Sequence, residues 1–298
     1  MDRRLLIATV ANGLFVVVEM SIGYYANSLS LVGDAFHNLT DTLALLLAFV
    51  AVRLERRPAT PERSFGYQRA GILAAFVNAG VLVAFTIFIF AEAARRIENP
   101  QPVQTGWMLA VAGIALLLNG GITLWFREAG RHDVNIRSAV MHMFADALAS
   151  AGVIVAALLI RWTGSTVFDP LISIVIGIMI LWSSWGILRE TVNLLLEGTP
   201  SGIDPQAVVR DLAAEEGVQG VHHVHIWAIA PSRPALSCHL QLGDVSLRSA
   251  GEVLYRVSRM LESRYQIAHT TIQFEAVGCP VDDPFCLRGE STSMIDSS

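Results

Sequence analysis

Lysine is absent from this chain of 298 residues: all 21 basic residues are arginine, and charged residues of both signs make up only 16% of it. The formal net charge of −5 gives no electrostatic basis for binding nucleic acid, so we expect no nucleic-acid partner. Cysteine is scarce, with three residues, Cys238, Cys279 and Cys286, all in the last third. In a cytosolic domain, such cysteines are expected to be thiols or metal ligands rather than disulfide partners.

Several motifs that mark enzymes and ATP-driven pumps are also missing. The chain has no Gly-x-x-x-x-Gly-Lys-Ser/Thr phosphate loop, no His-Glu-x-x-His metalloprotease motif and no Gly-x-Ser-x-Gly nucleophile turn. The sequence therefore gives no support for ATP-driven pumping or for hydrolysis within the membrane, and we predict that the protein is not an enzyme.

Apolar residues, by contrast, are abundant. They make up 53% of the chain, and the mean hydropathy of +0.50 is too high for an ordinary soluble domain. Six apolar stretches approach the roughly 20 residues that cross a bilayer as a helix. They are Leu5–Tyr24, Leu31–Val52, Ala70–Ala94, Trp107–Phe126, Ser138–Ile160 and Pro170–Leu188.

Arginine is distributed unequally between the two sets of connecting segments. Ten arginines lie at the start of the chain and near residues 53–69 and 127–137, whereas the opposite loops carry three. Because cytoplasmic loops are enriched in basic residues, we predict a multi-pass protein with both termini in the cytoplasm.

The same short pattern, His-x-x-x-Asp, occurs in two of the predicted spans. His37 and Asp41 lie in the second span, and His142 and Asp146 lie in the fifth. A spacing of four places both side chains of each pair on one helix face. If the two faces meet, two imidazoles and two carboxylates form a four-coordinate site suited to Zn²⁺ or a similar divalent ion. Four protein ligands leave no open position for a catalytic water.

Four further polar residues lie within predicted spans. Asp34 precedes His37 by three residues, on nearly the same face; it is interpreted either as a hydrogen-bond acceptor that orients a metal-bound histidine or as part of the ion's path. Packing or hydrogen bonding between helices explains Glu19, Asn78 and Asn119 at least as well as a functional role does.

These ligands also suggest a transport mechanism. Imidazole and carboxylate must lose their protons to bind a metal, so metal and protons compete, and imidazole titrates within the physiological range. A site open to each side in turn would exchange metal for protons. The sequence thus predicts a proton-coupled antiporter of divalent metals.

The last third has ordinary polar content and predicts a soluble domain. Gly198–Gly202 reads as a linker, and the pattern after it predicts the order α-β-β-α-β, typical of a small ferredoxin-like α+β domain. We predict a transport domain over 1–195, a linker over 196–202, a cytoplasmic metal-binding domain over 203–278 and a tail over 279–298. The fold class is therefore a six-helix membrane domain followed by a ferredoxin-like domain.

Five motifs resemble the cation diffusion facilitator family of zinc transporters, and the resemblance covers nearly the whole chain. Ser28–Asp41 is similar to the family's second span and Phe65–Ala70 to the start of its third. Val134–Arg137, leading to His142 and Asp146, is similar to the fifth. The other two motifs, Leu194–Pro200 and Val221–Trp227, are similar to its link to the cytoplasmic domain and to the first strand of that domain.

The resemblance implies a homodimer that exports Zn²⁺ against proton entry through His37, Asp41, His142 and Asp146. It also implies a regulatory zinc site formed by His222, His239 and Glu275, with Cys279 and Cys286 as candidate thiolate ligands. The six residues between these cysteines differ from the tight Cys-x-x-Cys spacing of strong zinc motifs. Strand alternation predicts that His223 and His225 share one face with His222 on the other, and we assign these two and His269 structural roles.

The chain departs from the family pattern at two places. Many relatives carry His where this chain has Gln68, so a secondary metal site near the membrane surface is expected to be weak or absent. A His-rich loop between the fourth and fifth spans is missing, which favours a bacterial-type exporter of the plasma (inner) membrane. Ligand type leaves Cd²⁺, Co²⁺, Ni²⁺ and Fe²⁺ open as cargo, and a sensor that binds metal without moving it is the alternative of a different class.

Overall fold

The computed structural model describes residues 3–126, 134–276 and 284–285. The chain divides into two compact units: one within residues 1–49 and 75–188, the other within 50–74 and 189–298. The six predicted spans are all helical. Their bounds are α1 Arg3–Tyr25, α2 Leu29–Glu55, α3 Ala70–Glu98, α4 Thr105–Phe126, α5 Val134–Thr163 and α6 Phe168–Leu195. Each therefore extends slightly beyond the apolar stretch that predicted it.

Length and composition make these helices candidates to cross a bilayer. Over the described residues, five helices, α2 to α6, are long and apolar enough to cross a membrane, and α1 contributes a shorter apolar helix, Gly13–Tyr25. Large apolar side chains face outward, such as Leu117, Trp162 and Trp182 at 76%, 84% and 85% exposure. In water such surface would be unstable, but it is the surface that a helix presents to lipid.

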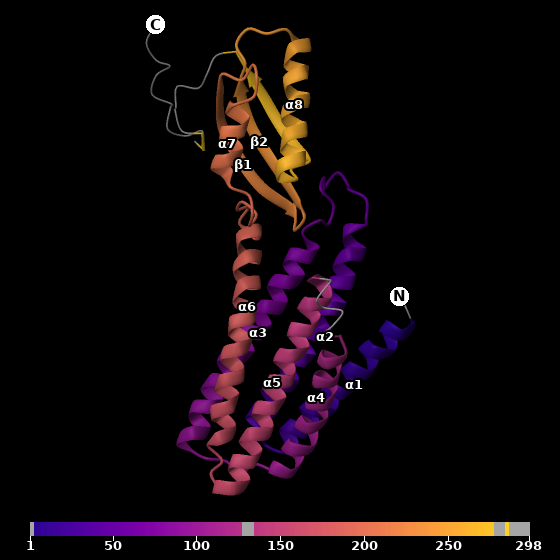
Figure 1. Ribbon diagram of the computed structural model, residues 1–298, viewed down its shortest axis with the longest axis vertical. Helices are drawn as coiled ribbons and strands as arrows, with labels where there is room; N and C mark the ends of the chain where they lie inside the picture. The colour runs from indigo at the N-terminus through magenta and orange to yellow at the C-terminus, as the bar shows by residue number, and fades with distance from the viewer. Residues whose placement is uncertain (1–2, 127–133, 277–283, 286–298) are drawn as a thin grey trace. The chain divides into compact units, whose positions relative to one another are not determined.

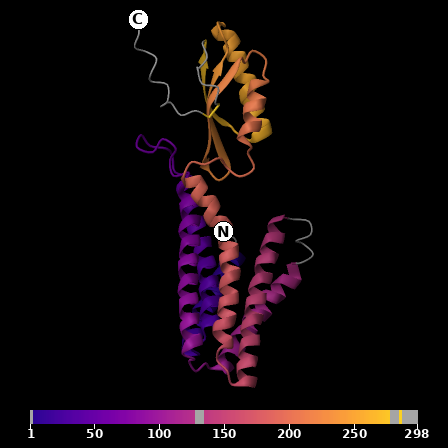
Figure 2. The same ribbon diagram turned by 90° about the vertical axis from the view of Figure 1, so that its left-hand side faces the viewer.

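In the first unit the helices lie side by side (Figures 1 and 2) and share one apolar core. It combines large residues with small ones, such as Met108 of α4 with Ala156 and Ala157 of α5, which are all fully buried. Small side chains let helices approach closely where lipid supplies no hydrophobic driving force. This packing brings the polar faces of α2 and α5 together.

A buried carboxylate joins the starts of α2 and α6. Asp169, in the first turn of α6, accepts hydrogen bonds at Oδ1 from Ser28 Oγ (2.7 Å), Ser30 Oγ (2.6 Å) and Ser30 N (3.1 Å), and at Oδ2 from Leu29 N (2.6 Å). The first N–H groups of a helix have no partner within it, so Asp169 caps α2 from another helix. The contact fixes the position of α2 relative to α6.

The second unit contains the predicted ferredoxin-like domain. Its elements are α7 Pro205–Ala213, β1 Gly220–Ala230, β2 Arg233–Gln241, α8 Leu247–Tyr265 and β3 His269–Glu275. The order α-β-β-α-β is the one predicted, and the sheet order is β1-β2-β3. β1 and β2 pair antiparallel as a hairpin, whereas the helical crossover through α8 makes β3 parallel to β2.

The two helices of this domain bury one face of the sheet (Figure 1). Leu236, Cys238 and Leu240 of β2 belong to that core, together with Leu212 of α7 and Val257 of α8. Because side chains alternate along a strand, the residues between them project to the other face of the sheet. His239 is one of these.

Candidate metal sites

The four residues of the repeated pattern meet between α2 and α5. His37 Nε2 lies 3.7 Å from Asp41 Oδ2 and 3.6 Å from Asp146 Oδ1. His142 Nε2 lies 3.0 Å from Asp41 Oδ2 and 3.6 Å from Asp146 Oδ2. The ligand atoms of His37, His142 and Asp146 form a group that could hold a metal ion, and Asp41 Oδ2 lies beside both histidines outside that group.

These separations can be compared with a metal coordination sphere. Zn–N and Zn–O bonds of about 2.0 Å in a tetrahedron place neighbouring ligand atoms about 3.3 Å apart. The four histidine–carboxylate separations, 3.0, 3.6, 3.6 and 3.7 Å, lie close to that edge length, and the two separations to Asp146 end on its two different oxygens. The arrangement suits a small tetrahedral ion with nitrogen and oxygen ligands.

Several polar atoms of this cluster are buried without a hydrogen-bond partner in the described part of the chain. They are His37 Nδ1, Asp41 Oδ2 and Asp146 Oδ1; the 3.0 Å approach of His142 to Asp41 therefore lacks hydrogen-bond alignment. Unpartnered buried acceptors are costly, and a bound cation would satisfy both carboxylate oxygens.

Exposure changes along the two helices at the cluster. The side chains of Asp41 and His142 are 30% and 43% exposed, whereas those of His37 and Asp146 are 14% and 4% exposed. Asp41 follows His37 along α2, and His142 precedes Asp146 along α5. The cluster is therefore open toward the C-terminal end of α2 and the N-terminal end of α5, and closed in the opposite direction.

A second cluster lies on the open face of the sheet in the second unit. His222 of β1 and His239 of β2 are direct cross-strand partners. His222 Nε2 is 3.0 Å from Glu275 Oε2, and His239 Nδ1 is 2.9 Å from Glu275 Oε1, without hydrogen-bond alignment at His239. The three residues that the resemblance implied are thus brought together by strand register. Imidazole and carboxylate ligands suit Zn²⁺.

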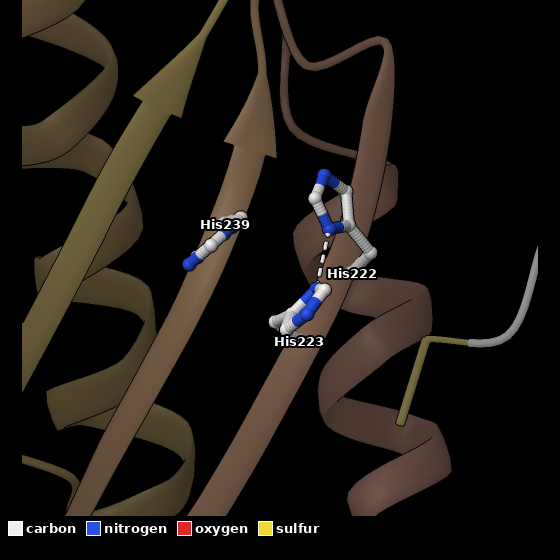
Figure 3. A group of neighbouring side chains, drawn as sticks. All are labelled: His222, His223 and His239. Carbon is white, nitrogen blue, oxygen red and sulfur yellow. Dashed lines mark hydrogen bonds between the residues drawn. The ribbon is translucent and has the colours of Figure 1, made fainter. Parts of the chain in front are cut away.

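His223 joins this cluster, contrary to the prediction from simple alternation. A β-bulge gives β1 one extra residue between His222 and His225, and His223 has φ of +53°. His223 Nδ1 lies 2.9 Å from His222 Nδ1, and its ring stacks on that of His239 at 4.7 Å (Figure 3). The bulge therefore groups three imidazoles that could hold one ion. The prediction that His223 lies on the opposite face from His222 was wrong, whereas its structural role stays a prediction.

The electrostatics of this cluster favour cation binding. Burial alone raises the pKa of Glu275, but the charges of His222 and His239 and hydrogen bonds from Gln273 and His222 outweigh it and lower that pKa. Burial and then the neighbouring imidazoles lower the pKa of His223. The carboxylate is ionised and the added imidazole is neutral at neutral pH, which are the forms that bind metal.

The remaining predicted positions are placed as follows. Cys238 is fully buried in the core, and burial raises the pKa of its thiol to about 12, so it is unsuited to metal binding. Cys279 and Cys286 lie outside the described residues. Gln68 Oε1 accepts a hydrogen bond of 3.4 Å from the Arg233 guanidinium, and a cationic neighbour opposes metal binding there.

Two family models match this chain. Residues 5–196 match the cation efflux transmembrane domain, and residues 200–277 match the cytoplasmic domain of cation efflux proteins. Together these matches cover most of the chain, one over the helical segment and one over the ferredoxin-like segment.

Three similar proteins align over nearly their whole length. Zinc transporter ZitB of Shigella flexneri is 41% identical over 294 residues, which cover 98% of this chain and 92% of that protein. The metal cation efflux system protein CzcD of Cupriavidus metallidurans is 36% identical, with 99% and 93% covered. The cadmium, cobalt and zinc/H(+)-K(+) antiporter of Bacillus subtilis is 36% identical, with 91% and 88% covered. The chain belongs to the cation diffusion facilitator family, as a multi-pass membrane protein that joins the family's cation efflux domain to its cytoplasmic domain.

Proposed function

We propose that this protein exports Zn²⁺ from the cytoplasm in exchange for protons, through the site formed by His37, Asp41, His142 and Asp146. The observation that carries the proposal is the convergence of two histidines and two aspartates from two helices, with histidine–carboxylate separations of 3.0 to 3.7 Å. Ionisable groups placed within a membrane are costly and are therefore functional candidates.

The donor set and the relatives support a zinc cargo. Two neutral imidazoles and two carboxylates provide borderline ligands that suit Zn²⁺ better than Mg²⁺ or Ca²⁺. The relative in Shigella flexneri is named a zinc transporter, and that in Bacillus subtilis a cadmium, cobalt and zinc antiporter. The same geometry also accepts Cd²⁺, Co²⁺, Ni²⁺ or Fe²⁺, which are the alternative cargoes.

The proposed direction of transport follows from charge and exposure. The arginine-rich segments assign both termini to the cytoplasm of a protein in the inner (plasma) membrane. In that orientation the exposed side of the site, at Asp41 and His142, faces the cytoplasm, and the buried side faces outward. The described conformation would then receive metal from the cytoplasm, and release requires the helices to open on the opposite side.

Zinc flux into proteoliposomes tests this proposal. Wild-type protein should move Zn²⁺ faster with an opposing pH gradient than without one. Asp41→Asn and Asp146→Asn should abolish the flux while the protein stays folded, because each variant lacks one anionic ligand. Glu98→Gln, a change at an exposed position on α3, serves as the control and should transport normally.

Each other outcome has a distinct meaning. Flux that persists in Asp146→Asn would refute the assigned site. Zinc binding by wild type without flux under any gradient would favour a metal sensor. Flux of another divalent ion in preference to Zn²⁺ would keep the mechanism and change the cargo.

We also propose that His222, His239 and Glu275, with His223, form a regulatory zinc site in a homodimer. Their grouping on an open sheet face supports it. In this proposal the domain bounds are those predicted from sequence: 1–195 for transport, 196–202 as the linker through which the cytoplasmic domain acts, 203–278 for that domain and 279–298 for the tail.

The regulatory site can be tested separately from the transport site. His239→Gln should lower turnover or apparent zinc affinity, whereas the membrane site still binds metal. His225→Gln, at the exposed histidine of the same strand, is the matched control. Identical kinetics for His239→Gln and wild type across a wide range of zinc concentrations would contradict the regulatory role.

A further inference from the structure

Two acidic side chains are buried in the membrane unit and take no part in the proposed metal site. Glu19 of α1 and Asp34 of α2 both have 0% exposure. Neither forms an ion pair with a basic group among the described residues. An isolated carboxylate is strongly disfavoured in such surroundings, so each is expected to carry a proton when the metal site is empty.

Each carboxyl group has one neutral hydrogen-bond donor and one unpartnered oxygen. Glu19 Oε2 accepts from Asn38 Nδ2 at 3.2 Å, and Asp34 Oδ2 accepts from Ser150 Oγ at 3.2 Å. Glu19 Oε1 and Asp34 Oδ1 have no partner within the described chain. Asn38 follows Asp34 by one helical turn, so one face of α2 connects the two acids. A single neutral donor stabilises a carboxylate only weakly. Hydrogen bonding therefore does not hold either acid in the ionised form, and each can bind and release a proton.

The position of this pair relative to the metal ligands follows from the way α2 and α5 pair. Asp41 approaches His142, His37 approaches Asp146, and Asp34 accepts from Ser150. This is an antiparallel ladder in which Asp34 lies one helical turn, about 5 Å, beyond His37. The acids lie on the closed side of the metal site, opposite the exposed Asp41 and His142.

Charge balance links the two buried acids to the four metal ligands. A divalent ion adds two positive charges to a low-dielectric region, and loss of one proton from each acid adds two negative charges. The net charge is then unchanged, which avoids most of the cost of charging the membrane interior. We propose that Glu19 and Asp34 form a proton-binding site that gives up its protons when metal occupies the four ligands and takes them back when the metal leaves. This inference rests on the proposed antiport.

The charged neighbours of the pair are few. The charged groups whose fields reach it are His37 of α2 and Asp146 of α5, whereas α4 contains no acidic or basic residue. Metal at the four ligands replaces two negative carboxylates by a neutral assembly. The part of the negative field that adds to burial in keeping the acids protonated is thereby removed, and proton release follows.

Proton release on zinc binding measures this directly. Purified full-length protein in weak buffer with a pH indicator is titrated with ZnCl₂, and protons released per zinc bound are counted. Glu19→Gln and Asp34→Asn hold the shape of the protonated acid but cannot lose a proton, so each should release about one proton fewer per zinc and, by linkage, bind zinc at least about tenfold more weakly at the same pH. Their flux should also lose most of its dependence on the pH gradient. Glu98→Gln should match wild type in both measurements.

The possible results separate this inference from the antiport itself. Release by wild type that is unchanged in both variants overturns the proton site and leaves the antiport intact. No release by wild type overturns the antiport, and this inference with it. A second measurement on wild type does not depend on the variants folding: infrared difference spectra should show loss of the C=O stretch of protonated carboxyl groups when zinc binds, and spectra without that loss would also overturn the inference.

Discussion

Replacement of Asp169 by Asn provides a stringent test of how α2 is held. The Asp169 carboxylate accepts four hydrogen bonds, three at Oδ1 and one at Oδ2. Asparagine keeps one acceptor oxygen and replaces the other by an NH₂ donor. In either amide orientation at least one backbone N–H at the start of α2, that of Leu29 or that of Ser30, faces a donor and loses its only acceptor.

The size of the effect can be worked out from these hydrogen bonds. A buried donor left without an acceptor costs about 1–3 kcal/mol, and bonds to a charged group exceed neutral ones by about 1 kcal/mol each. Relief of the desolvated charge offsets part of this cost. We expect a net destabilisation of about 2–4 kcal/mol, or about 30- to 700-fold in the ratio of unfolded to folded protein.

Unfolding by SDS in mixed micelles, followed by tryptophan fluorescence, measures this change. The control is Asp244→Asn, an exposed aspartate in the loop before α8, which should shift stability by less than about 0.5 kcal/mol. A double variant, Ser28→Ala with Ser30→Ala, should reproduce part of the loss. The same stability for Asp169→Asn as for the control would refute the claim that Asp169 caps α2.

Two further predictions concern packing and pH. A Cβ added at Gly177 of α6 would lie 2.5 Å from Phe90 Cε1, so Gly177→Ala should destabilise the helical domain by about 1–3 kcal/mol. Gly186→Ala in the same helix meets nothing within 4 Å and should be neutral or stabilising by up to about 1 kcal/mol in the same SDS titration. Hydrogen bonds, from Tyr265 first and then Arg264, lower the pKa of Asp211. The contribution of Asp211 to stability is therefore present above the pKa of the carboxyl in the unfolded chain. It is lost as the pH falls through the lower pKa of the carboxyl in the folded protein. Tyr265→Phe should lower the unfolding midpoint at neutral pH, and the difference should vanish in acid; a constant difference at all pH values would contradict this account.

The sequence by itself determined the helices and the pairs of metal ligands. The length of each apolar stretch is a local property that requires a bilayer-spanning helix, and all six stretches are helical in the structure. The spacing of four in His37 to Asp41 and in His142 to Asp146 depends only on helix geometry, so each pair was predictable. Turn signals such as Asp204-Pro205 likewise located the start of α7, where Asp204 caps the helix.

Tertiary structure alone decided which groups face one another. The bulge at His223 depends on the pairing of β1 with β2, and strand alternation in one sequence cannot reveal an inserted residue. The cap that Asp169 supplies to α2 joins residues about 140 positions apart, so no local signal marks it. Glu19 could be attributed to packing as readily as to function until the fold showed it fully buried, bonded to Asn38 one helical turn from Asp34, and in no ion pair within the described chain. The physical reason is the same in each case: local patterns fix helices and faces, but burial and charge pairing depend on which segments, distant in the chain, pack against one another.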